Sequence, residues 1–274
     1  MQLKWKSKFQ LKPGKWVFEP TDESIRLGHE IKSAIEKIWV PPENYFHLRS
    51  GGHVGAIRSH MGNNFFLKVD IQNFFGSINR TRITRSLNKF FNYQKARRWA
   101  IASTVVAPTD EKKIILPFGF VQSQLISSVC FSESALGKCV TEMHSDESLR
   151  VSVYVDDIIV SSVNKESCES SLEKIRKAAG NSHFQLNEDK LDGPSESITA
   201  FNVVLTNNRI EISASRMDDF RKTIASTTNE HERAGILSYV SSVNIDQAAE
   251  LEAVPSRVLK LISTMEHERN AGGD

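Results

Sequence analysis

The sequence is poor in cysteine and contains no long apolar run. Three cysteines occur among 274 residues, at positions 130, 139 and 168, and no two of them form a CxxC pair. This scarcity argues against a disulfide framework or a cysteine-rich zinc site and indicates reduced thiols in a cytoplasmic protein. No stretch of about 20 uncharged apolar residues is present, so the sequence predicts no transmembrane helix. The N-terminal residues also lack the apolar core of a signal peptide.

The chain also lacks a strong excess of charge of either sign. Its formal net charge is +2, with 39% hydrophobic and 25% charged residues. This ordinary globular composition excludes disorder, collagen and coiled coil, and by itself does not indicate a nucleic-acid-binding protein. Residues 1–15 are an exception, because they carry five lysines and no acid, interleaved with Trp5 and Phe9. Such a segment suits either contact with a nucleic-acid backbone or a solvated tail.

The spacing of apolar residues predicts an alternation of helices and strands. A helix starts at Thr21 or Asp22 and stops before Pro41, and residues 43–64 read as loops and short strands. A helical tail follows residue 216 and is broken at Pro255. The order of the elements favours an α+β fold with one sheet covered on one face. Further helices are predicted over 82–91, 94–105, 124–143 and 164–179, and strands over 65–71, 151–162, 184–186, 198–205 and 209–212.

Two adjacent aspartates interrupt the most strand-like segment. Asp156 and Asp157 lie within 151–162, VSVYVDDIIVSS, although aspartate is disfavoured in strands. A carboxylate pair at a hairpin tip repels itself unless a cation is present, and Mg²⁺ prefers such oxygens. A simple polar turn is the alternative interpretation.

A third aspartate stands where another apolar run ends. Asp70 closes the strand-like start of residues 66–78. If Asp70 and Asp156 lie side by side on adjacent strands, they can hold two metal ions that bridge a triphosphate. The alternative role for Asp70 is to cap a helix.

These two segments resemble motifs A and C of reverse transcriptases, above all the bacterial retron-type enzymes. Residues 70–78, DIQNFFGSI, match every fixed position of D-I-x-x-F-F-x-S-I. The later segments resemble motif B (116–123), motif D (184–190, ending in lysine), the primer grip (198–201) and the start of a thumb (234–244). The resemblance implies a right-hand polymerase with fingers at 1–64, a palm with a fingers insertion at 65–212, and a helical thumb at 213–274.

The resemblance implies an RNA-directed DNA polymerase, a nucleotidyltransferase that uses two Mg²⁺ ions, with Mn²⁺ as a substitute. It takes deoxynucleoside triphosphates, copies an RNA template into DNA and has no membrane partner. A bacterial anti-phage defence system or retron is the implied setting, and the template is a non-coding RNA. A protein partner or a second copy of the chain is left open.

The same resemblance assigns roles to individual residues. Asp70, Asp156 and Asp157 are the catalytic carboxylates, and Ile71 joins them in the implied set of metal ligands. Phe75 occupies the gate position, where a bulky ring crowds the 2′-hydroxyl of a ribonucleotide. The remaining nucleotide-binding candidates are Ser123, Lys190, Arg58 and Lys68, and the primer and template candidates are Tyr154, Gly119 and Gln122.

Departures from the retron pattern keep other functions open. Motif B has Phe118, Phe120, Val121 and Gln122 where retron enzymes have Gln, Ala, Pro and Thr, which leaves template handling open. The Asn-Ala that precedes the retron histidine is absent before His60, and residues 198–200 read Ile-Thr-Ala where retrons have Val-Thr-Gly, which favours a defence-associated relative. Template-independent or protein-primed DNA synthesis by the same palm is one alternative, and an inactive nucleic-acid-binding subunit is another. A zinc-dependent module built on His47, His53 and His60 is a third, but no fourth ligand lies at a metal-site spacing.

Overall fold

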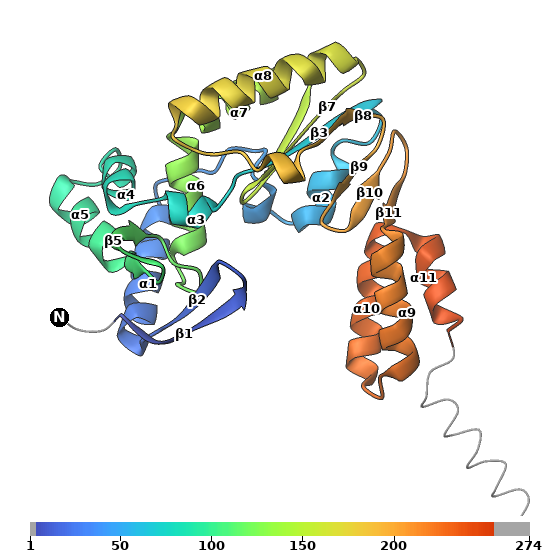
Figure 1. Ribbon diagram of the computed structural model, residues 1–274, viewed down its shortest axis with the longest axis horizontal. Helices are drawn as coiled ribbons and strands as arrows, with labels where there is room; N and C mark the ends of the chain where they lie inside the picture. Colours follow the sequence, from blue (N-terminus) through green and yellow to red (C-terminus); the bar gives the residue numbers. More distant parts are fainter. Residues whose placement is uncertain (1–3, 255–274) are drawn as a thin grey trace, which may run out of the picture.

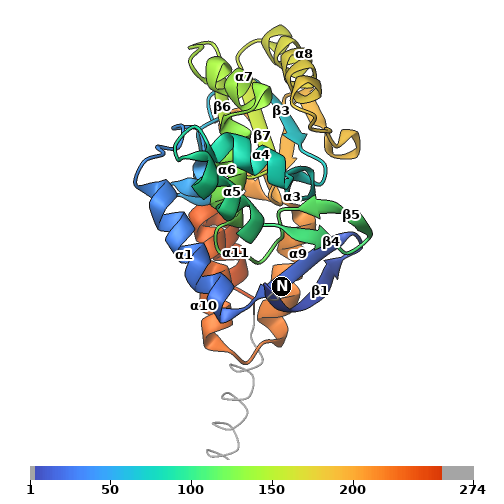
Figure 2. The same ribbon diagram turned by 90° about the vertical axis from the view of Figure 1, so that its left-hand side faces the viewer.

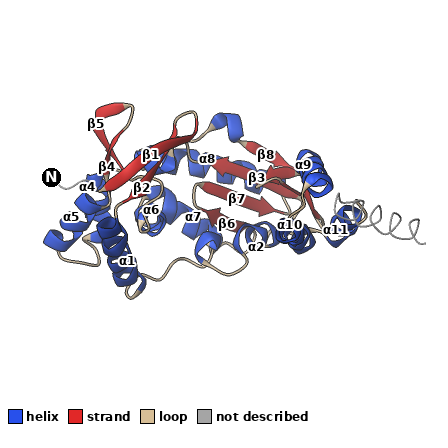
Figure 3. Ribbon diagram, turned by 90° about the horizontal axis from the view of Figure 1, so that it is seen from below, coloured by secondary structure: helices blue, strands red, loops and turns tan. Residues whose placement is uncertain are grey.

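A four-stranded antiparallel sheet forms the centre of the protein, in the order β6-β7-β3-β8. The computed structural model describes residues 4–254. Within this part of the chain, no helix combines the length and the apolar character that crossing a bilayer requires. Figure 3 shows the four strands side by side, with helices behind them. The strands are β3 (Phe65–Asp70), β6 (Arg150–Tyr154), β7 (Asp157–Ser162) and β8 (Asp192–Ser195).

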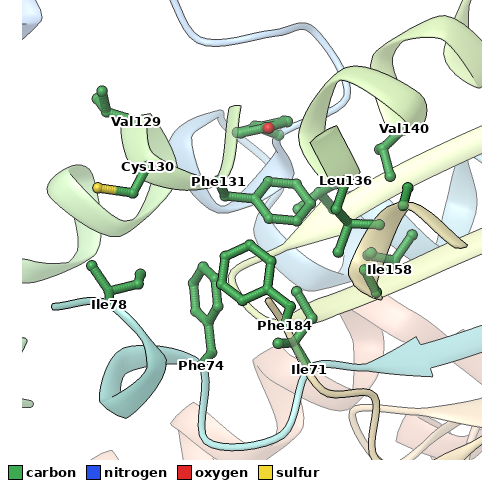
Figure 4. Packing of buried hydrophobic residues seen from close by; sticks show 14 of the residues in the cluster. Ile71, Phe74, Ile78, Val129, Cys130, Phe131, Leu136, Val140, Ile158 and Phe184 are labelled. Carbon is green, nitrogen blue, oxygen red and sulfur yellow. The ribbon is translucent and has the colours of Figure 1, made fainter. Parts of the chain in front are cut away.

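One face of this sheet supports the main hydrophobic core. Side chains alternate between faces along a strand, so Leu67 and Val69 of β3 and Ile158 and Val160 of β7 share this side. Helices α7 and α8 lie across it, at the top of Figure 1. Figure 4 shows how aromatic rings fill the interior of this core. The helices of this region are α3 (Phe74–Ser77), α4 (Arg80–Leu87), α5 (Tyr93–Ala102), α6 (Ser123–Ser132), α7 (Ala135–His144) and α8 (Lys165–Asn181).

The opposite face supports a second core. Phe66 and Ile159 pack against α2, a small sheet of order β11-β10-β9, and three C-terminal helices. The sheet is therefore covered on both faces, and the expectation of cover on one face was wrong. The end that carries Tyr154, Asp156 and Asp157 remains partly exposed. The elements are α2 (Gly52–Arg58), β9 (Ile198–Ala200), β10 (Val203–Leu205), β11 (Ile210–Ile212), α9 (Ala214–Ser226), α10 (Glu230–Val243) and α11 (Ile245–Glu252).

Two hairpins that the sequence analysis did not predict lie side by side, as Figure 2 shows. Phe18, Val105 and Phe120 form a small core between them. The Phe18 N–H donates to the Phe118 carbonyl at 2.9 Å. Alternating lysine and apolar residues before Pro13 were a usable strand signal for the first hairpin. The strands are β1 (Trp5–Lys12), β2 (Lys15–Pro20), β4 (Val105–Ala107) and β5 (Asp110–Ile115).

Local sequence signals placed most of the other elements correctly. The helix α1 (Asp22–Glu36) is capped by the Thr21 hydroxyl, as predicted. The prediction of loops and short strands over residues 43–64 was wrong, since this segment forms α2 and a 3₁₀ turn at Phe46–Leu48. The glycines at the start of α2 interrupt the apolar periodicity that would have indicated a helix. The helical tail is confirmed as far as Glu252, where α11 ends, and the expected break at Pro255 lies outside the described residues.

Helix boundaries inside the core were less well predicted. The single helix expected over 124–143 is divided into α6 and α7, because Ser134 caps a new helix by accepting the Gly137 N–H. Gly180 was expected to end α8, but the helix continues to Asn181. The strand expected at 184–186 is reduced to an isolated bridge between Leu186 and Ile71.

Candidate active site

Three carboxylates gather where β3 ends and the β6–β7 hairpin turns. Asp70 is the last residue of β3 and pairs in register with Asp157, the first residue of β7. Directly opposed residues of antiparallel strands share a face, with their Cβ atoms roughly 4.5–5.5 Å apart. Asp156 lies in the turn itself, so its side chain is not the cross-strand partner that the sequence analysis proposed for Asp70.

The turn that carries Asp156 has a strained main chain. Strands β6 and β7 are joined by Val155 and Asp156 alone, and Val155 has φ 60°. A positive φ at the first of two loop residues is typical of a type II′ turn, whose first position favours glycine. The Asp156 carbonyl accepts a hydrogen bond from the Ile71 N–H at 2.9 Å, which connects the turn to the end of β3.

A lysine from a distant segment completes the cluster. The chain at 185–190 runs beside the end of β3, because the Asn187 N–H donates to the Asp70 carbonyl at 2.9 Å. This contact brings Lys190, at the end of a 3₁₀ turn, to the same carboxylate. Its Nζ donates to Asp70 Oδ2 at 2.9 Å, and the Asp70 side chain is only 5% exposed.

The pKa values of the clustered carboxyl groups show that their charged forms are unfavourable without a nearby positive charge. Burial, together with the charges of Asp156 and Asp70, raises the pKa of Asp157 to about 7. Burial and the charge of Asp70 also raise the pKa of Asp156, which Lys190 and Lys15 partly oppose. The hydrogen bond to Asp70 raises the pKa of Lys190. The site therefore favours binding of a cation.

The donor set fits a hard divalent ion, which is what carboxylate oxygens bind best. Ile71 is buried and its N–H is engaged by Asp156, so its carbonyl oxygen is the one atom it can offer as a ligand. Across residues 4–254, no three His, Cys, Asp or Glu side chains are grouped closely enough to form a finished metal cage.

Phe74 and Phe75 point into different surroundings. Phe74 packs on Phe131 and Phe184 in the main core, as Figure 4 shows. Phe75 lies against Phe118 instead, with ring centroids 4.3 Å apart, and is 7% exposed. This division supports Phe75 as the gate residue, and the gate role itself stays a prediction.

The structure divides the motif B candidates, since Gly119 is exposed whereas Gln122 and Ser123 are buried. Gly119 has φ 100°, and a Cβ there would collide with the Phe18 carbonyl of β2. Gln122 is buried, where its Nε2 donates to Ser103 Oγ at 3.1 Å. Ser123 is also buried and its hydroxyl has no partner. Gly119 packs beside the N-terminal hairpin, and Gln122 lies against Gly28 of α1. Because Gln122 is buried, it is not placed to contact a template.

The two basic candidates that precede motif A, Arg58 and Lys68, lie in different parts of the structure. Arg58 donates to the Ser242 carbonyl on α10 and is not brought to Asp70. Lys68 shares the strand face of Asp70, donates to the Thr199 carbonyl at 3.0 Å, and lowers the pKa of Asp157. Only Lys68 of this pair is therefore placed to act near the carboxylates.

Tyr154 lies in an aromatic cluster beside the turn. Its ring meets the edges or faces of Phe201, His47 and His53, at centroid distances of 5.1 to 6.0 Å. A cleft of about 550 Å³ opens between this cluster and the helices α9 and α10. The position supports contact with a bound strand, which stays a prediction.

Sequence reasoning missed Lys15 as a site residue. Its ammonium lies 4.5 Å from the centroid of Phe118 and contributes to the potential at Asp156. The lysine-rich N-terminus was the available signal, but only the hairpin β1–β2 brings Lys15 to the site.

The three histidines that suggested a zinc module have separate partners. His47 contacts the turn at Val155, and His53 bonds Tyr239 on α10. His60 is fully buried between Ser152 and Ser161. His47 and His53 both pack on Tyr154, but among residues 4–254 these imidazoles belong to no group of three side chains that could hold a metal ion.

Comparison with known proteins assigns this arrangement to a family. Residues 21–203, about two thirds of the chain, match the family model described as reverse transcriptase (RNA-dependent DNA polymerase). A comparison with curated proteins gave no match.

Solved structures share the fold at low sequence identity. Telomerase from Candida albicans, with a fragment of telomeric RNA, aligns with a TM-score of 0.53 and 10% identity over 84% of this chain and 46% of its own. A foamy viral protease-reverse transcriptase in complex with double-stranded DNA aligns with a TM-score of 0.50 and 18% identity over 84% and 34%. The chain thus spans less than half the length of these proteins. Their common architecture is the right-hand polymerase fold of helices and antiparallel sheets.

Proposed function

The chain belongs to the reverse transcriptase family, and from that premise we propose that it is an RNA-directed DNA polymerase. The proposed reaction adds deoxynucleotides to the 3′-hydroxyl of a growing DNA strand and releases pyrophosphate. Deoxynucleoside triphosphates are the substrates, and an RNA strand is the template.

One observation carries this proposal: the placement of Asp70 opposite Asp157, with Asp156 in the adjoining turn. The two strands that provide these residues are separated by more than 80 positions in the sequence, yet their ends coincide. A structural role would not require three acids at one partly exposed strand end, because their repulsion destabilises the fold.

The carboxylates would hold two Mg²⁺ ions, for which Mn²⁺ can substitute. When bound, these ions activate the attacking hydroxyl and stabilise the departing pyrophosphate. Asp70 and Asp157 supply oxygens from one strand face, and Asp156 supplies them from the turn. Lys190 keeps its proton at neutral pH, because Asp70 raises its pKa. Its ammonium can therefore neutralise or protonate a phosphate oxygen.

The domain limits follow from the same placement. We propose fingers before residue 65, a palm over 65–212 that holds both carboxylate strands, and a thumb from residue 213. The second core supports the thumb limit, since α9, α10 and α11 pack chiefly on one another and on the small sheet. The hairpin β4–β5 and helices α4 and α5 form the fingers insertion within the palm.

We also propose a bacterial retron or a defence-associated enzyme as the biological setting. The motif A match supports this assignment, and the absence of Asn-Ala before His60 together with Ile-Thr-Ala at 198–200 favours a defence-associated relative over a retron enzyme. A non-coding RNA is the proposed template, and the cytoplasm is the proposed location.

The burial of Gln122 and Ser123 in motif B favours a second candidate, template-free or protein-primed synthesis by the same palm. In templated synthesis, motif B must give a base pair close access to the backbone. Here the Phe18 carbonyl occupies the space beside Gly119. A polymerase that needs no paired template tolerates the burial of Gln122 and Ser123.

A primer-extension assay separates these functions. The purified chain is incubated with Mg²⁺, labelled deoxynucleotides and an RNA template with a DNA primer, and in parallel with single nucleotides and no RNA. Templated synthesis predicts extension that follows the RNA sequence and no homopolymer in the parallel reaction, whereas homopolymer supports the second candidate. Asp156→Asn should abolish either product; unchanged activity of the variant would remove the enzymatic proposal.

A further inference from the structure

One imidazole holds the turn that carries Asp156 from outside the sheet. Val155 donates its backbone N–H to His47 Nδ1 at 3.0 Å, and His47 Nε2 lies 2.8 Å from Ser128 Oγ on α6. Because a backbone N–H can only donate, Nδ1 is the unprotonated nitrogen and Nε2 carries the ring proton. Ser128 accepts that proton and donates its own hydroxyl to the Gln124 carbonyl at 2.9 Å. The Val153 carbonyl also lies 3.4 Å from Nδ1, but the Val155 N–H is closer, at 3.0 Å, and makes Nδ1 the acceptor. Donors and acceptors then agree along the rest of the series, from Nε2 through Ser128 to Gln124.

The surroundings fix the orientation of the imidazole before any ligand arrives. The ring of Tyr45 stacks on His47 at 5.8 Å, and Tyr154 presents an edge at 5.9 Å. The segment that carries His47 is itself bound to the edge strand β6, since the Val153 N–H donates to the Asn44 carbonyl at 2.8 Å. The acceptor nitrogen is thus preorganised toward the turn.

The turn needs such a partner because its conformation is unfavourable. Val155 is β-branched and has φ 60°, in a region that β-branched residues rarely adopt because it is strained. On the other side of the turn, the Ile71 N–H binds the Asp156 carbonyl at 2.9 Å. His47 and Ile71 therefore hold consecutive residues of the turn from opposite sides.

We propose that His47 is a positioning residue for the catalytic turn. By accepting the Val155 N–H, it holds the turn so that the Asp156 carboxylate stays beside that of Asp70. Its consequence for catalysis rests on the proposed polymerase function. The bond links α6, which follows motif B, to the carboxylates, so the two motifs are fixed relative to each other by a side chain that belongs to neither.

Three substitutions separate positioning from general stability. In His47→Asn, the amide Oδ1 takes the place of Nδ1 and can accept the Val155 N–H. In His47→Gln, the amide reaches toward Ser128 instead, and His47→Phe offers no acceptor at all. We expect kcat to stay within about threefold for the Asn variant and to fall about ten- to hundredfold for the other two. The KM for the deoxynucleotide should change less than twofold in all three.

Two measurements do not depend on polymerase activity. The Mg²⁺-induced rise in melting temperature should be retained by His47→Asn and reduced in His47→Gln and His47→Phe. Nitrogen-15 NMR of the histidine-labelled wild-type protein should show His47 protonated on Nε2, with the signal assigned by its loss in His47→Asn. An Nδ1-protonated ring would overturn the inference, whatever the protein does to nucleotides.

The kinetic results can overturn it as well. If His47→Asn loses as much kcat as His47→Phe, or if His47→Gln and His47→Phe keep wild-type kcat, His47 does not position the turn. A rise in KM without a fall in kcat would place its effect on nucleotide binding instead and would equally contradict the proposal. If the wild-type protein makes no DNA, the polymerase proposal fails, and the NMR and metal-dependent melting data still decide the role of His47.

Discussion

Lys190 Nζ lies 2.9 Å from Asp70 Oδ2, although 120 residues separate the two in the sequence. The carboxylate is buried and the lysine is more than half exposed, so the ion pair lies at the boundary between the protein interior and solvent. The ammonium supplies the positive charge that the crowded carboxylates require. A metal ion bound at the same oxygens would share that role.

Removal of this charge should weaken the fold in a metal-dependent way. Lys190→Ala leaves the buried Asp70 carboxylate without its ion pair. We expect a loss of about 1–2 kcal/mol, discounted for the exposure of the lysine, which is about 2–8 °C in melting temperature. Added Mg²⁺ should recover most of this loss. Lys190→Arg is the control that keeps the charge, and an Ala variant that melts like the wild type at every Mg²⁺ concentration would contradict the pairing.

A smaller residue at position 75 should relax the choice of sugar. Phe75→Val removes the ring that rests on Phe118, which leaves room for a ribonucleotide 2′-hydroxyl. We expect the ratio of ribonucleotide to deoxynucleotide incorporation to rise about tenfold or more, as 1.4 kcal/mol of relieved clash would give. Phe74→Leu is the matched control, because that ring lies in the core: it should lower the melting temperature and leave the ratio unchanged. If the ratio is unchanged in Phe75→Val, then Phe75 is not the residue that excludes ribonucleotides.

Two glycines should respond oppositely to alanine. Gly119→Ala forces a Cβ against the Phe18 carbonyl at a positive φ, so we expect a loss of about 2 kcal/mol or more and faster proteolysis of the hairpin β1–β2. Gly180 lies inside α8 with open space around it, and Gly180→Ala should raise stability by about 0.5–1 kcal/mol. Thermal melting of both variants tests the pair, and a neutral Gly119→Ala would mean that the hairpin does not pack there.

The buried histidine His60 should make the fold sensitive to acid. Burial, and to a lesser extent the charge of Arg150, lowers its pKa from 6.5 to about 3. The unfolded chain therefore binds a proton that the folded chain refuses, so stability is complete above about pH 6.5 and is lost as the pH falls toward 3.

The measurement is the unfolding free energy from pH 7 to pH 4, compared between the wild type and His60→Gln. The amide can still bond Ser152 and Ser161 but does not titrate, so the variant should lose less stability over this range, by up to a few kcal/mol. Carboxyl groups titrate in both proteins and cancel in the comparison. Parallel curves would show that His60 is protonated without penalty.

Local patterns were enough to find the carboxylates. Asp70 closes a run of apolar residues, and Asp156 and Asp157 interrupt another, so their positions at strand ends could be read from residues within a few places of them. The cap at Thr21 and the helical tail were predictable for the same reason. The pairing partner of Asp70 was not predictable in this way. The register depends on the two-residue turn at Val155, and this turn lacks the glycine that usually marks such turns in a sequence.

The sequence by itself determined which side chains carry the chemistry, since carboxylates at strand ends and the motif A pattern are properties of short segments. Only the tertiary structure decided which groups support them. Lys190 was a candidate from motif D, but only the fold pairs it with Asp70. Lys15 and His47 come to the turn at Val155 and Asp156 from more than a hundred residues away, and the N-terminal hairpin packs beside Gly119. Such contacts arise from the burial of apolar faces shared by distant elements, and no local spacing encodes them.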